Sequence, residues 1–158
     1  MKKEYMQVML DSLQKKKLVL KELTDKTMMQ QHVLSQEEVK WELFETLIDE
    51  KDPLITYLMT LDQGFAAVFE KIKDDLANEI DDYRTEMAVM QQEIKEISAI
   101  SSNLEALEHR NKKLVEEKMA AERRNIKHSK KSSKAVMEYY QRMNKINTVD
   151  PQLMDKKS

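Results

Sequence analysis

The chain has 158 residues and a formal net charge of −2, and it contains one glycine, two prolines and no cysteine. So few turn formers exclude the hairpins of a β-sheet protein, and the charged residues that separate its apolar stripes are typical of helical bundles and coiled coils. The absence of cysteine excludes disulfides, thiolate metal sites and a cysteine nucleophile. The composition predicts an all-α fold.

The first apolar stripe predicts a helix over about residues 3–32. Its apolar side chains recur at spacings of three, four and seven, which places them on one helical face. They are Met6, Met9, Leu10, Leu13, Leu20 and Leu23.

The stretch "LSQEEV" predicts the start of a second helix, over about residues 36–61. Ser35 and Glu38 have the spacing of a capping box, and Leu34 and Val39 occupy the flanking positions of a hydrophobic staple. Pro53 is expected to kink this helix without ending it, because the apolar stripe continues past it; a restart capped by Asp52 is the alternative.

A turn is expected at "LDQGF", where Asp62 is a candidate cap and Gly64 eases a tight bend. The third helix is then predicted over about residues 63–129, since its apolar stripe meets no further glycine or proline. It would span roughly 95 Å against roughly 40 Å for each of the first two helices. We therefore predict an antiparallel three-helix bundle or coiled coil over residues 1–130, with a long protruding third helix.

A protruding third helix would leave part of its apolar stripe without a partner in the chain. An apolar stripe exposed to water indicates a contact surface. Three interpretations follow. The stripe binds an amphipathic helix of a client protein, or it pairs with a second copy of the chain as a coiled-coil homodimer, or the first or second helix is displaced and covers it. The candidate client-binding residues are Ile94, Ile97, Ile100, Leu104, Leu107 and Leu114.

Residues 131–158 are predicted to form a basic, largely flexible C-terminal tail. Within it, "AVMEYYQRM" at residues 135–143 places Val136, Tyr139 or Tyr140, and Met143 at helical spacing. A helix this short is marginal in water by itself. A short amphipathic segment on a flexible tether is typical of a recognition element that folds when it binds.

Nothing in the sequence predicts an enzyme, a cofactor or a metal site. His32, His109 and His128 have no second histidine at helical spacing, and one glycine cannot form a phosphate-binding loop. Residues 109–134 are rich in lysine and arginine, but glutamates interrupt them and no aromatic residue lies among them, so we expect no nucleic-acid binding. A nucleic-acid or membrane-surface binder whose affinity falls steeply with salt remains an alternative.

No apolar run reaches the roughly 18 residues of a membrane span, and the first residues lack the apolar core of a signal peptide. We therefore expect no membrane insertion and a cytoplasmic protein.

The order of these features resembles the FlgN-type flagellar export chaperones, in particular FlgN-like proteins of Gram-positive motile bacteria. The resemblance covers nearly the whole chain and depends mainly on the "LDQGF" turn and on the tail with "SKAVMEYYQRM" and "MDKKS". Pro53 departs from that pattern, because the second helix of the family usually runs unbroken.

The resemblance implies a cytoplasmic chaperone that binds and sequesters hook-filament junction (hook-associated) proteins and delivers them to the flagellar type III export apparatus. It implies that the distal third helix and the tail bind the C-terminal helical segments of these clients. It also implies that a tail tyrosine, Tyr139 or Tyr140, docks at the export gate. The alternative of a different class is a self-associating coiled-coil structural or spacer protein.

Overall fold

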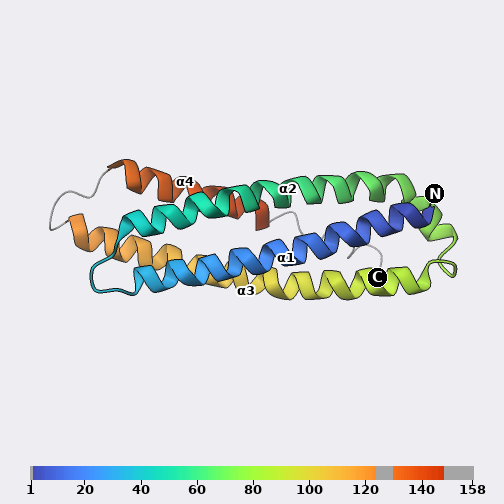
Figure 1. Ribbon diagram of the computed structural model, residues 1–158, viewed down its shortest axis with the longest axis horizontal. Coiled ribbons are helices and arrows are strands. Elements are labelled where there is room, and N and C mark those ends of the chain that lie inside the picture. Colours follow the sequence, from blue (N-terminus) through green and yellow to red (C-terminus); the bar gives the residue numbers. More distant parts are fainter. Residues whose placement is uncertain (1, 124–129, 148–158) are drawn as a thin grey trace.

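The computed structural model describes residues 2–123 and 130–147, which form four helices (Figure 1). These are α1 (Lys2–Leu34), α2 (Trp41–Asn78), α3 (Arg84–Arg123) and α4 (Lys130–Asn147). The described residues contain no strand, so the all-α prediction is confirmed. The predicted end of the long helix at 124–129 and the last part of the predicted tail, 148–158, lie outside the described residues.

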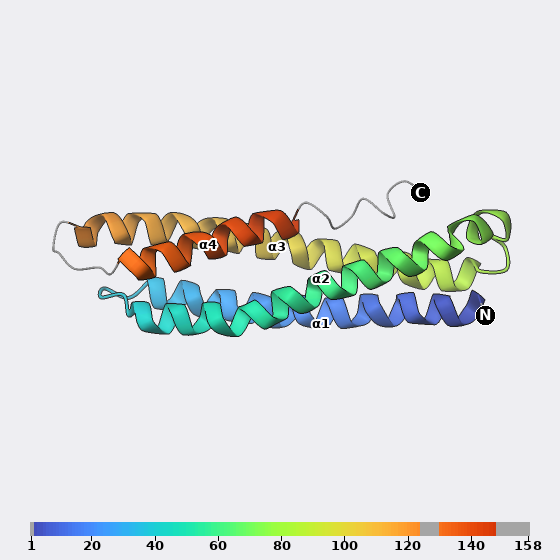
Figure 2. The same cartoon turned by 90° about the horizontal axis from the view of Figure 1, so that it is seen from above.

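Helix α1 lies against both α2 and α3 along their lengths (Figure 1). Helix α4 is shorter and lies against α2 and α3 at the end of the molecule where α2 begins and α3 ends. Figure 2 shows α2 running obliquely, from a position beside α1 at its start toward the side of α3 at its end. A cross-section through one half of the molecule therefore contains α1, α2 and α3, and in the other half α4 is the fourth helix.

The α1 helix extends slightly beyond its predicted bounds, and its apolar stripe forms part of the core. Met9, Leu23 and Leu34 are completely buried. At 20 to 33 cal/mol for each Å² of apolar surface removed from water, a side chain of this size contributes roughly 1.5–3 kcal/mol. The periodicity of the first 32 residues therefore identified the core face of α1 correctly.

The predicted capping box at Ser35 is wrong. The Ser35 hydroxyl donates to the Gln31 carbonyl at 2.7 Å, which ties it to the end of α1. Helix α2 begins only at Trp41, and its N-cap, Lys40, makes no side-chain capping bond. Leu34 and Val39, the predicted staple residues, are nevertheless both buried. Burial of these apolar side chains therefore stabilises the connection between α1 and α2 without the predicted cap.

The predicted turn at "LDQGF" is also wrong, because α2 runs through Asp62 and Gly64 without a break. A glycine in a helix costs only about 1 kcal/mol relative to alanine. Burial of Phe65 and Phe69 on the next turns outweighs that cost. Asp62 accepts a hydrogen bond from Lys16 Nζ on α1 at 2.7 Å, so it forms an ion pair and does not cap a helix.

Gly64 gives a simple test of this correction. A Cβ added to Gly64 would meet no other atom within 4 Å. Gly64→Ala should therefore raise the free energy of unfolding by about 0.5–1 kcal/mol, since alanine lowers the entropy of the unfolded chain and favours the helix. Urea unfolding followed by far-UV circular dichroism measures the change. A loss of stability would mean that the chain turns at Gly64.

The chain reverses instead at residues 79–83, where neither glycine nor proline occurs. The Glu79 N–H donates to the Asp75 carbonyl at 2.9 Å and closes α2, and the Asp82 N–H donates to the Glu79 carbonyl at 3.0 Å. Asp81 and Asp82 then precede the first turn of α3, where negative charge is favourable near a helix N-terminus. Ile80 is half exposed, whereas Tyr83 is buried against the core.

This position of the turn gives α2 and α3 nearly equal lengths. With 38 and 40 residues they span roughly 57 and 60 Å, against roughly 50 Å for the 33 residues of α1. The predicted helices at 36–61 and 63–129 are therefore wrong in their bounds. No third helix protrudes in the described part of the chain.

Candidate helix-binding groove

Five of the six residues predicted to bind a client belong to the core or pack against it. Ile97 and Leu104 are 4% and 2% exposed. Ile94, Ile100 and Leu114 pack against the buried residues, and Leu107 is half-buried. Because α1 extends along α3, the stripe that was expected to be open is covered within the chain. The premise of an uncovered client-binding stripe is wrong, and Leu104→Glu would disturb the core instead of testing a binding surface.

The predicted amphipathic segment 135–143 lies within α4, and its apolar face is docked on the bundle. This face consists of Val136, Tyr139, Tyr140 and Met143, all at most 3% exposed. The spacing of three, four and seven residues makes them one stripe. Glu138 and Gln141 lie on the opposite, exposed side. We call the surface of α2 and α3 that receives this stripe the α4 groove.

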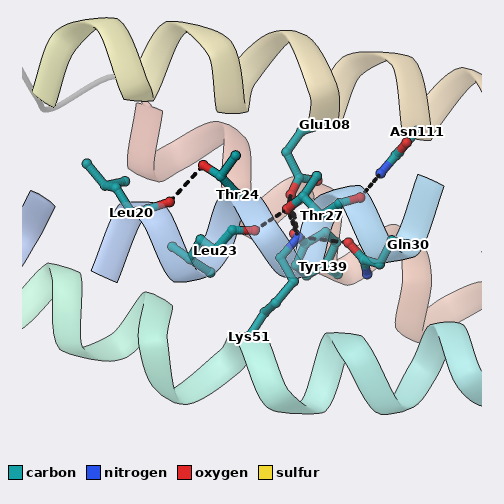
Figure 3. A network of polar contacts seen from close by, with 9 residues as sticks. All are labelled: Leu20, Leu23, Thr24, Thr27, Gln30, Lys51, Glu108, Asn111 and Tyr139. Carbon is teal, nitrogen blue, oxygen red and sulfur yellow. Dashed lines mark hydrogen bonds and ion pairs between the residues drawn. The ribbon is translucent and has the colours of Figure 1, made fainter. Parts of the chain in front are cut away.

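A buried ion pair lies beneath Tyr139 (Figure 3). Lys51 of α2 is completely buried, and its ammonium pairs with Glu108 of α3. Lys51 Nζ also donates to Thr27 Oγ1 at 2.7 Å and to Gln30 Oε1 at 2.8 Å, both on α1. These three acceptors match the three donors of an ammonium group. Burial lowers the pKa of Lys51, and the Glu108 carboxylate acts in the opposite direction.

Tyr139 of α4 covers this ion pair. Its hydroxyl donates to Glu108 Oε1 at 2.5 Å, and Lys51 Nζ lies 4.5 Å from the centre of its ring. Burial raises the pKa of Tyr139 well above its ordinary value, and the negative charge of Glu108 raises it further. The phenol therefore stays protonated and remains a donor at neutral pH.

The same cluster ties α1 to α3. Asn111 Nδ2 of α3 donates to the Thr27 carbonyl at 3.0 Å. Thr27 Oγ1 lies 2.7 Å from the Leu23 carbonyl oxygen and 2.9 Å from Glu108 Oε1, and its single proton serves one of them at a time. All four helices thus contribute a side chain to one buried polar cluster, defined here as Thr27, Gln30, Lys51, Glu108, Asn111 and Tyr139.

At the rim of the α4 groove, Arg142 Nη1 donates to Asp52 Oδ1 at 2.6 Å, and both groups are partly exposed. On the other side, the seam between α3 and α4 contains a pocket of about 430 Å³. Ser102, Glu105, Ala106, Glu108, His109, Lys112, Tyr140 and Met143 line it. Two buried atoms of these residues, the Tyr140 hydroxyl and Glu108 Oε2, have no hydrogen-bond partner in the described chain. Helix α4 therefore does not fill its groove completely.

The sequence predicted the apolar stripe of residues 135–143, but the flexible tail expected to carry it is wrong up to Asn147, because burial of that stripe holds α4 on the bundle. The polar cluster beneath the stripe was not predicted. A signal for the cluster was present. Lys51 lies between Ile48 and Ile55 at core spacing, and Glu108 and Asn111 follow Leu104 at core spacing. A lysine on one apolar stripe and a glutamate on another are rare enough in a core to indicate a pair.

The described part of the chain contains no candidate metal site and no candidate membrane-spanning helix. No cluster of three or more histidine or acidic side chains there could hold a metal ion. His128 lies outside the described residues. Within residues 2–123 and 130–147, no helix combines the length and apolar character needed to cross a bilayer.

Comparisons with known proteins give no relative for this groove. No protein-family model matches the chain, and no curated protein or solved structure resembles it at a significant level. The groove and the polar cluster must therefore be interpreted from their own chemistry.

Proposed function

We propose that this protein is a cytoplasmic flagellar type III export chaperone that binds the helical C-terminal segment of a hook-filament junction protein in the α4 groove. One observation carries the proposal: a short amphipathic helix, α4, is seated on α2 and α3 through Val136, Tyr139, Tyr140 and Met143. A groove that holds one amphipathic helix has the geometry to hold another. Sequestration of the client needs no nucleotide and no covalent chemistry.

The proposed client-binding surface differs from the one expected from sequence. The apolar stripe within residues 94–114 of α3 packs in the core, so we place the client on the side of α2 and α3 that α4 covers. In this proposal α1, α2 and α3 form an antiparallel bundle that remains intact, and only α4 is exchanged. The resemblance to FlgN-type chaperones supports the class of client, and the groove supports the mode of binding.

Helix α4 has the properties of an occupant that can be displaced. Most of the stability of an amphipathic helix in a protein comes from the packing of its apolar face, so the docked state of these 18 residues depends on their contacts with the groove. Those contacts leave the seam pocket open, and they leave Glu108 Oε2 and the Tyr140 hydroxyl without hydrogen-bond partners among residues 2–123 and 130–147. A client helix that fills the pocket or bonds these atoms would bind more favourably than α4.

The position of Tyr139 and Tyr140 links client binding to delivery. Both side chains are buried beneath α4, so neither is accessible to an export gate while α4 is docked. In the proposed cycle the client takes the groove, α4 leaves it, and the tyrosines become available. Only the loaded chaperone would then present its docking signal.

The first experiment is multi-angle light scattering of the protein alone and mixed with the C-terminal helical segment of a hook-filament junction protein. We expect a monomer that forms a stoichiometric complex. A stable dimer that ignores the client would favour the alternative, a self-associating coiled-coil spacer. The covering of the α3 stripe by α1 removes the sequence-based reason for that alternative.

A crosslink across the rim of the groove tests whether α4 must leave. The sequence has no cysteine, so Asp52→Cys with Arg142→Cys introduces the only two thiols. After reaction with a short bis-maleimide, the double variant should lose client binding, whereas each single variant treated in the same way should keep it. Undiminished binding by the crosslinked protein would place the client elsewhere.

A further inference from the structure

The floor of the α4 groove is charged and cannot be covered by an apolar side chain without loss. Lys51 and Glu108 are 0% and 4% exposed, so their charged groups depend mainly on protein partners while a helix lies on them. All three protons of the Lys51 ammonium are already used, by Thr27, Gln30 and Glu108. The carboxylate of Glu108 still needs donors from above, because a carboxylate is an acceptor only.

Helix α4 supplies one such donor, to Oε1, the oxygen that also accepts from Lys51, whereas Oε2 has no hydrogen-bond partner among the described residues. The Tyr139 hydroxyl donates to Glu108 Oε1 at 2.5 Å, and the ring above Lys51 adds a cation–π contact at 4.5 Å to its centre. A phenylalanine would keep the ring and its contact with Lys51 but would remove the donor. Buried sites built to bond a hydroxyl discriminate strongly against the analogue that lacks it, since their polar groups are then left unpaired.

Tyr140 provides an internal comparison, because it is the adjacent residue and also lies against the groove. Its ring packs edge to face with that of Tyr139 at 5.0 Å between centres, and it is 3% exposed. Its hydroxyl, however, has no hydrogen-bond partner in the described residues. The groove therefore uses Tyr139 as a donor and Tyr140 as an apolar surface.

We infer that the α4 groove selects partner helices that carry a hydrogen-bond donor, such as a tyrosine hydroxyl, at the position above Lys51 and Glu108. Such a helix also carries apolar residues three positions before the donor residue and four positions after it. This stripe repeats the arrangement of Val136, Tyr139 and Met143. The inference rests on the proposed function, because it names the chemistry of the helix that the groove accepts. It assigns specificity to the buried ion pair.

The experiment uses the full chain and three fluorescein-labelled synthetic peptides. One has the sequence of residues 130–147, the second contains Tyr139→Phe and the third Tyr140→Phe. Tethered α4 competes equally with every peptide and lowers all affinities by the same factor, so the ratios of Kd report selection. We expect the Tyr139→Phe peptide to bind about 10-fold or more weakly than the first, and the Tyr140→Phe peptide to bind within about 3-fold.

A matched receptor tests whether the ion pair causes the preference. In the chain with Lys51→Met and Glu108→Leu, the ion pair is absent, and the Tyr139→Phe peptide should bind as well as the first peptide or better. Equal binding of all three peptides to the native chain would overturn the inference and leave the proposed function standing. Binding of none of them, even to a chain in which Val136→Glu has released α4, would overturn both, because the groove would then not accept a helix from solution.

The role of the Tyr139 hydroxyl can also be tested on α4 itself, in the full chain and without any peptide. Hydrogen exchange of the backbone amides of residues 134–143 reports how often α4 opens. In the full chain, Tyr139→Phe should raise the opening equilibrium about 10-fold, whereas Tyr140→Phe should leave it unchanged or lower it. Equal exchange in the two variants would overturn the role assigned to the Tyr139 hydroxyl.

Discussion

Lys51→Met should destabilise the protein by about 3–5 kcal/mol, the range measured when one partner of a buried ion pair is removed. Methionine fills a similar volume and suits the helix, so the loss comes from Glu108, whose buried carboxyl group is left without its ammonium partner. Tyr139 and Thr27 would still donate to that carboxylate, but neither carries a positive charge. Urea unfolding followed by circular dichroism measures the change.

Two further variants separate the ion pair from simple packing. Lys51→Met with Glu108→Leu should recover most of the lost stability, because two apolar residues of similar size often replace a buried pair without loss. Lys16→Met removes the lysine of the Lys16–Asp62 pair. It should lower the free energy of unfolding less than Lys51→Met does, because the Asp62 side chain is 24% exposed and water can solvate it. Equal losses in Lys51→Met and in the double variant would show that Lys51 matters for its shape alone.

Val136→Glu should release α4 from its groove while α1, α2 and α3 stay folded. The Val136 side chain is completely buried, and an unpaired carboxylate in its place would cost several kcal/mol. A penalty of about 3 kcal/mol is more than a 100-fold change in the docking equilibrium. Hydrogen exchange should therefore show loss of protection over residues 134–143 and retained protection in the other helices.

Met137→Glu is the matched control, since it places the same charge on the next residue of the same helix, where the side chain is 37% exposed. It should leave the exchange of α4 unchanged. Under the proposed function, Val136→Glu should also bind a client more tightly than the native chain, because an empty groove removes the competition. Weaker client binding by this variant would mean that α4 is part of the client site.

The sequence allowed the helical class, the inward face of α1 and the apolar stripe of residues 135–143 to be predicted, because they depend on spacing alone, but not the docking of that stripe on the bundle. Met9 and Leu23, and likewise Val136 and Met143, are buried as their periodicity indicates. The positions of the helix ends could not be predicted in the same way. Gly64 indicated a turn, but its cost is small beside the burial of Phe65 and Phe69, and tertiary packing decided the outcome.

One misplaced turn explains the error in the predicted site. With the reversal at Gly64, the third helix would extend far beyond its partners and expose residues 94–114. With the reversal at residues 79–83, the three long helices are of similar length and the same residues are covered. The real turn has no glycine or proline, and its apolar residues Ile80 and Tyr83 keep the helical spacing, so periodicity does not detect it. The paired acids Asp81 and Asp82 are the local signal for the start of α3.

The connection of α4 to α3 through residues 124–129 sets a threshold for any ligand of the groove. A segment tethered this closely competes at an effective concentration in the millimolar range, whatever the amount of protein in the cell. A free helix must therefore bind the groove with an intrinsic affinity high enough to exceed this internal competitor. Weakly amphipathic segments of unfolded or nascent chains would not displace α4, so the groove would exclude them without any residue that repels them. The attached helix would then act as a filter, and its strength could be adjusted by changing the length of the connection alone.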